Sequence, residues 1–200
     1  MLNGIVGNNF ISNRFLRFST DSGVGLDPTI TTVGATFEWI SPDGSISTGA
    51  IPNPVLDQTG AYVVKCSDWS DVSRLKVDDD HLIILANLHV FTALDRLDCY
   101  TNSISVLDVA TLVSMTTLYC QTNSISTLDV SALTALTLIW CQDNNMNQTN
   151  VDKILADLVT AGANDGVAKL AGTNAAPSAA GLANKAILEA APRNWTITVS

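Results

Sequence analysis

A 21-residue period constrains the fold of this 200-residue chain more than any other feature of its sequence. The segment LDCYTNSISVLDV, which begins at Leu97, returns as LYCQTNSISTLDV and then, more weakly, as IWCQDNNMNQTNV. An earlier, degenerate copy begins at Leu75. A fixed step of this length means that each copy forms one supersecondary unit, and that neighbouring copies bury the apolar edge that a single copy leaves open. We therefore expect residues 75–148 to form stacked units joined by a parallel sheet.

Each copy contains an L-x-C pattern, which predicts a short strand with the leucine and the cysteine pointing inward. A small apolar side chain fits a buried strand position, so the recurrent cysteines are expected to be core thiols. A disulfide between neighbouring strands is the open alternative, although a straight ladder sets the side chains side by side. The three cysteines are Cys99, Cys120 and Cys141.

An asparagine follows each of these cysteines by three residues, at Asn102, Asn123 and Asn144. We expect each asparagine to turn the chain and to hydrogen-bond backbone groups of the adjacent copy, which would form a buried structural ladder. The unit resembles the 21-residue class of leucine-rich repeats that is common in bacterial and phage surface proteins. The resemblance implies a short leucine-rich-repeat solenoid over residues 75–148.

Residues 149–200 depart from the repeat and carry two helix patterns, TNVDKILADLVTAG and APSAAGLANKAILEAA, each followed by a short strand pattern. Thr149 or Asn150 is expected to cap the first helix at its start and Gly162 at its end. The second helix is expected to open at Pro177-Ser178 and to end near Pro192. Strand, helix and strand in this order form a right-handed parallel crossover. We therefore expect a C-terminal α/β cap that continues the repeat sheet, and the tail resembles those that close this repeat class.

Residues 15–74 contain short β-branched and aromatic runs separated by Gly, Pro, Asp and Ser, which predicts an all-β sandwich. Trp39, the turn SPDGS and the motif D-x-x-G-x-Y that ends at Tyr62 resemble Ig-like and PKD-like domains. Residues 1–14 are rich in Asn and Gly and are expected to form an arm that orders against a partner. The predicted fold class is mixed α/β: an N-terminal Ig-like β-sandwich followed by a short leucine-rich-repeat solenoid with a C-terminal α/β cap.

The sequence gives little support to catalysis. Ten basic and nineteen acidic side chains give a net charge of −9 without a run of Lys or Arg, which argues against nucleic-acid binding. No thiol has an evident general base, and nucleotide-binding glycine motifs are missing. The run DDDH (Asp78 to His81) lacks the alternating order of a calcium loop, so we expect a solvated loop. We predict a non-enzymatic protein without cofactor, metal or membrane insertion.

Outward residues of the predicted strands form two rows. One row runs Lys76, Asp98, Tyr119, Trp140, and its neighbour runs Asp78, Tyr100, Gln121, Gln142. Aromatic rings beside amides and carboxylates offer stacking together with directed hydrogen bonds. We therefore predict a binding face for protein or glycan that comprises Asp98, Tyr100, Tyr119, Gln121, Trp140 and Gln142. The alternative is that Tyr119 and Trp140 cover the sheet or pack on a neighbouring subunit.

Ig-like and leucine-rich modules are typical of exported proteins, whereas the first residues lack the features of a signal peptide. A tailed-phage protein reaches the outside on the particle, which removes this contradiction. We predict a virion-surface component (a capsid decoration, neck or fibre protein) that docks to capsid or other virion subunits through its N-terminal arm and sandwich. Its repeat face would meet a host-surface protein or glycan. The alternative is an internalin-like adhesin on the bacterial cell surface.

Overall fold

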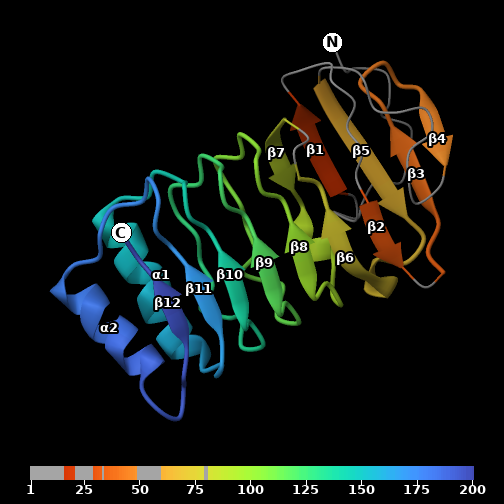
Figure 1. Ribbon diagram of the computed structural model, residues 1–200. Coiled ribbons are helices and arrows are strands. Elements are labelled where there is room, and N and C mark those ends of the chain that lie inside the picture. Colours follow the sequence, from red (N-terminus) through yellow and green to blue (C-terminus); the bar gives the residue numbers. More distant parts are fainter. Residues whose placement is uncertain (1–15, 21–28, 33, 49–59, 79–80) are drawn as a thin grey trace.

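The computed structural model describes residues 16–20, 29–32, 34–48, 60–78 and 81–200. These residues form two β-sheets, a five-stranded one in the N-terminal part of the molecule and a seven-stranded one that runs to two α-helices at the C-terminal end (Figure 1). The five-stranded sheet has the strand order β4-β3-β5-β1-β7, and the seven-stranded sheet has the order β12-β11-β10-β9-β8-β6-β2. One continuous hydrophobic core runs through both sheets.

The five-stranded sheet is antiparallel throughout. Its strands are β1 (Leu16–Thr20), β3 (Phe37–Ile40), β4 (Ile46–Thr48), β5 (Gly60–Cys66) and β7 (Leu82–Ala86). The predicted SPDGS turn joins β3 to β4, and there the Gly44 N–H donates to the Ser41 carbonyl at 2.9 Å. The aromatic side chains of Trp39 and Tyr62 are buried, since alternate residues of each strand face the core.

The seven-stranded sheet is parallel except at one edge. Its strands are β2 (Thr29–Thr32), β6 (Val72–Lys76), β8 (Arg96–Asp98), β9 (Thr117–Tyr119), β10 (Leu138–Trp140), β11 (Val167–Lys169) and β12 (Thr196–Thr198). The edge strand β2 runs antiparallel to β6, and every later pair is parallel. The 21-residue step sets the register, because it aligns Leu97, Leu118 and Ile139 across β8, β9 and β10.

Two helices connect the last three strands of this sheet: α1 joins β10 to β11, and α2 joins β11 to β12. Helix α1 (Gln148–Ala161) lies behind β11 and β12 in the view of Figure 1, and α2 (Ala179–Glu189) packs against α1. The N-cap of α1 is Asn147 rather than the predicted Thr149 or Asn150, because the Asn147 side chain accepts the Asn150 N–H. Gly162 at φ 87° ends α1, and Ser178 caps α2, as predicted. Two 3₁₀ helices, η1 (Trp69–Asp71) and η2 (Leu88–Val90), lie between strands.

The predicted fold class, mixed α/β with an Ig-like sandwich followed by a leucine-rich-repeat solenoid and an α/β cap, is wrong. The described residues form a mainly β structure of two sheets with only two α-helices. Two strands also cross the expected boundary at residue 74. Strand β7 leaves the expected repeat and pairs with β1, whereas β2 leaves the expected sandwich and pairs with β6. The N-terminal strands therefore complete both sheets instead of closing a sandwich of their own.

Some predicted features lie outside the described residues. These are the N-terminal arm, residues 1–14, and Asp57 of the corner motif. Gly60 and Tyr62 of the same motif lie on β5. In the part of the chain that the structure describes, neither helix has both the length and the apolar character that are needed to cross a membrane.

Candidate binding face on the parallel sheet

The candidate site is the outer face of the seven-stranded sheet. Residues that alternate with the inward leucines form two aligned rows on this face, which we call the outer sheet face. The first row is Arg74, Arg96, Thr117, Leu138, Val167, Thr196, and the second is Lys76, Asp98, Tyr119, Trp140, Lys169, Thr198. The predicted Tyr100, Gln121 and Gln142 follow the strands β8, β9 and β10 by two residues.

Asp98 does not belong to the exposed part of this face, although the sequence analysis placed it there. Its exposed fraction is 1%, because two arginine side chains cover it. Arg74 Nη2 donates to Asp98 Oδ2 at 2.6 Å, and Arg96 Nε donates to Asp98 Oδ1 at 3.0 Å. The hydrogen bond to Asp98 raises the pKa of the Arg96 guanidinium. A buried carboxylate with two cationic donors is a fixed structural element, and a ligand does not reach it.

The aromatic residues of the second row form a cross-strand stack. The rings of Tyr119 and Trp140 meet edge to face, with centroids 5.0 Å apart and planes at 80°. Arg96 Cζ lies 5.0 Å from the Tyr119 centroid, and Lys169 Nζ lies 3.6 Å from the Trp140 centroid. The two cations therefore enclose the aromatic pair, and each contact stabilises the outer sheet face by cation–π attraction. Lys169 covers one face of the Trp140 ring, so this face is not open for stacking on a sugar.

Polar side chains beside the aromatic stack are incompletely paired. Trp140 Nε1, Gln121 Oε1 and Gln142 Oε1 are buried without a hydrogen-bond partner among the described residues. On the β6 side of the face, Lys76 Nζ lies 2.8 Å from Asp78 Oδ1. Burial alone would raise the pKa of Asp78, but hydrogen bonds from Lys76 and Tyr100 outweigh it and hold the pKa below its usual value. The Lys76–Asp78 pair on the β6 side is thus satisfied internally, whereas the Trp140 side retains one unpaired donor and two unpaired acceptors.

The spacing of the strands under this face is held by a ladder of asparagine side chains. Asn123 Nδ2 donates to the carbonyl oxygens of Cys99 at 2.9 Å and Cys120 at 3.2 Å, and Asn123 Oδ1 accepts the Ile104 N–H at 2.9 Å. Each side-chain amide thus connects its own repeat unit to the preceding repeat unit. Asn102 and Asn144 make the equivalent bonds.

A fourth asparagine extends the ladder and was not found in the sequence. Asn174 Nδ2 donates to the Cys141 and Leu170 carbonyls, each at 2.9 Å, and Asn174 Oδ1 accepts the Asn144 N–H at 3.1 Å. It escapes the 21-residue period because helix α1 lengthens this step. It also follows its strand by five residues, whereas Asn144 follows its strand by four. The available signal was the segment LAGTN after the predicted strand.

The cysteine ladder has no nucleophilic character. Cys99, Cys120 and Cys141 are free thiols with 0% exposure. Burial raises the pKa of Cys120 to about 12, and burial together with the neighbouring Cys120 raises the pKa of the other two well above the usual value. Burial also raises the pKa of the half-buried Cys66. Thiols of this kind stay protonated and react slowly.

The described residues of the acidic run and the two histidines do not converge on a metal site. His81 and His89 are exposed, Asp78 pairs with Lys76, and residues 79–80 lie outside the described part. Among the described residues, no group of three or more His, Cys, Asp or Glu side chains is placed to hold a metal ion. Asp108 accepts the Ala110 N–H, and Asp129 accepts the Ser131 N–H and hydroxyl, so both cap local turns.

The sequence analysis missed three cationic residues of the face. Arg74 and Arg96 precede Lys76 and Asp98 of the predicted row by two residues, and Lys169 lies in the segment GVAKLAG. A signal for Lys169 was present, because aligning Ala168 with Ile139 sets it beside Trp140.

No known protein-family model matches this sequence, and a search of the curated proteins finds no match. The resemblance to leucine-rich repeats and to Ig-like or PKD-like domains therefore stays a prediction that rests on the motifs.

Proposed function

We propose that this chain is a non-enzymatic structural and binding protein of a tailed-phage particle, as a capsid decoration, neck or fibre protein. The observation that carries the proposal is the outer sheet face, where half-buried aromatic and cationic side chains stand on a parallel sheet of fixed spacing. Rigid strands and a buried asparagine ladder hold these side chains in place. Such a face suits recognition, in which a few well-placed side chains provide most of the binding energy.

The assignment to a particle rests on the sequence. The repeat and the N-terminal β-rich part both resemble modules of surface proteins, and phage subunits reach the surface on the particle. In this proposal the N-terminal part docks onto capsid or other virion subunits, and the outer sheet face points away from the particle. The protonated, buried thiols and the separate, exposed histidines support a binding role over a catalytic one.

Peptide mass spectrometry of purified particles, cell envelope and cytosol from the source tests the location. Enrichment in particles at a copy number close to that of the major capsid protein supports a decoration protein, and low copy number supports a neck or fibre protein. Absence from particles together with presence in the envelope refutes the particle and favours a cell-surface adhesin.

A further inference from the structure

We propose that the outer sheet face binds an acidic, extended protein segment, which crosses the strands from β6 to β11 with a carboxylate at each end and apolar residues between. This inference rests on the proposed function and specifies the chemistry of its partner. It follows from the charges on the face, from their spacing and from the apolar centre between them.

The outer sheet face is cationic on a strongly acidic chain. It holds four of the ten Lys and Arg side chains, but with Asp78 beside it only two of the nineteen carboxylates. Arg74 and Arg96 share the single carboxylate of Asp98, which leaves one positive charge in excess at this end. Lys169 contributes the second excess charge at the β11 end, where its partner is the Trp140 ring. A local excess of this sign attracts anionic partners and steers them to the face.

The spacing of the two charge centres matches an extended chain. Neighbouring strands lie about 4.8 Å apart, so β11, which carries Lys169, is about 14 Å across the sheet from β8 with Arg96 and about 19 Å from β6 with Arg74. An extended peptide rises about 3.3 Å per residue. Two carboxylates about four to six residues apart would therefore reach both centres at once.

The centre of the face favours a protein segment over a glycan. Tyr119, Trp140, Leu138 and Val167 are half-buried, and Leu138 lies directly beside Val167 on the neighbouring strand. Aliphatic side chains bind apolar side chains well and offer nothing to sugar hydroxyls. The Trp140 ring, moreover, is covered on one face by Lys169. An apolar residue in the middle of the bound segment would complete this patch.

The unpaired polar atoms on the outer sheet face and at the ends of its strands also suit a peptide. Trp140 Nε1 is a donor, and Gln121 Oε1 and Gln142 Oε1 are acceptors, all without a partner among the described residues. An extended backbone presents carbonyl and N–H groups in alternation, so it supplies both complements. Small side-chain rotations on binding would bring these atoms into contact with the segment.

The direct test is fluorescence anisotropy of a labelled peptide that carries two glutamates at each end and leucines between them. The matched probe has glutamine in place of every glutamate, and polygalacturonate serves as the anionic glycan competitor. We expect the acidic peptide to bind, to weaken as salt is raised, and to bind at least tenfold more tightly than the glutamine peptide.

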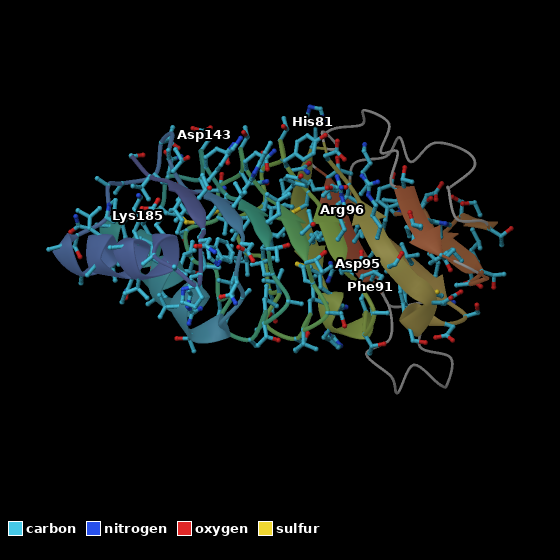
Figure 2. All side chains as sticks on the ribbon, turned by 60° about the horizontal axis from the view of Figure 1, so that its bottom comes forward. His81, Phe91, Asp95, Arg96, Asp143 and Lys185 are labelled. Carbon is cyan, nitrogen blue, oxygen red and sulfur yellow. The ribbon has the colours of Figure 1, made fainter. Side chains whose placement is uncertain are left out.

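Two single-charge variants locate the site. Lys169→Gln removes a cation from the face, and Lys185→Gln removes one from α2, where Figure 2 shows Lys185 toward the C-terminal end of the molecule and well apart from Arg96. We expect Lys169→Gln to weaken binding about threefold to fivefold, as for the loss of one exposed ion pair, and Lys185→Gln to leave it unchanged.

Trp140 gives a second readout, because Trp39, Trp69 and Trp195 are buried. The peptide should shield Trp140 from iodide, and Trp140→Phe should remove that signal.

Equal affinity for the two peptides, equal effects of the two lysine variants, or preferential binding of polygalacturonate would each overturn the inference. Salt-sensitive self-association that excludes the peptide would also overturn it, with a second copy as the occupant. The particle fractionation is independent of all these results. If the chain is found in particles but does not bind the acidic peptide, the proposed function stands and only the proposed ligand is refuted.

Discussion

At the residue scale, single side chains fix the distance between strands. The side-chain amides of Asn102, Asn123, Asn144 and Asn174 each hydrogen-bond backbone groups of two neighbouring repeat units. Each amide therefore supplies hydrogen bonds that the backbone of the turns would otherwise lack. Asn123 and Asn144 are 7% and 1% exposed, and water cannot compensate for their loss. The sequence period predicted three members of this ladder, because each repeats at the same interval.

Asn123→Ala is expected to destabilise the fold by roughly 1–3 kcal/mol or more, since the Cys99 carbonyl and the Ile104 N–H both lose a partner. Urea unfolding followed by circular dichroism measures the change. Asn164→Ala, at an exposed position after α1, is the matched control and should leave the midpoint in place. Equal midpoints for the two variants would mean that the ladder carries no stability.

Thr122→Asn is expected to stabilise the fold by about 1 kcal/mol. Thr122 has φ 55°, in the left-handed region, which β-branched residues disfavour and asparagine tolerates. Its neighbour one step earlier, Thr101, has φ 53°. Thermal unfolding measures the gain, and Thr127→Asn, at an exposed position that is not among the left-handed residues, provides the comparison. A lower melting temperature for Thr122→Asn would contradict this expectation and would mean that the threonine side chain stabilises the fold by more than its left-handed φ costs.

At the element scale, the strands were easier to predict than their partners. The 21-residue period and the helix caps placed β8 to β12, α1 and α2 close to their observed positions, because local spacing encodes them. The exchange of β2 and β7 between sheets was not predictable, since an alternating apolar pattern does not state which strand it pairs with. The candidate face shows the same limit. Spacing found Tyr119 and Trp140, whereas the burial of Asp98 depends on arginines from two strands.

Gly166→Ala is expected to disturb the pairing of β11 with β12. A methyl group on Gly166 would lie 2.5 Å from Trp195 Cζ2, and Trp195 is 3% exposed, so the ring has little room to move. Overpacking of this kind costs about 1–3 kcal/mol. Gly34→Ala is the matched control, because the added methyl group would meet only Asp71 Oδ2 at 3.7 Å. Denaturant midpoints compare them, and equal values would contradict this account of β11–β12 packing.

At the scale of the whole molecule, both sheets share one core, so the described residues should unfold together. The three buried thiols lie in the middle of this core and are inaccessible while it is intact. Their chemistry therefore reports on global stability.

Alkaline pH is expected to destabilise the fold through these thiols. Their folded pKa values are raised, to about 12 for Cys120, above the ordinary thiol value of 9.0. Above pH 9 the unfolded chain loses thiol protons that the folded chain keeps, so the free energy of unfolding falls between about pH 9 and 12. Urea midpoints from pH 8 to 10.5 measure the fall. It should be smaller in Cys120→Ala than in the parent chain, and parallel pH curves would exclude a contribution from Cys120.

The strand exchange between the sheets has a consequence for how such a chain can evolve. A recombination event at residues 74–75 would cut through β6, which pairs with β8, and would separate β1 from β7. Neither product would carry a complete sheet at its cut end. A crossover after β7 leaves the five-stranded sheet whole, but it still divides β6 from β8. Beyond β8, by contrast, whole repeat units can be gained or lost, because each unit pairs only with its neighbours and every junction joins one parallel strand to the next. Lineages of this protein should therefore differ in the number of steps, while the first ninety or so residues are inherited as a block.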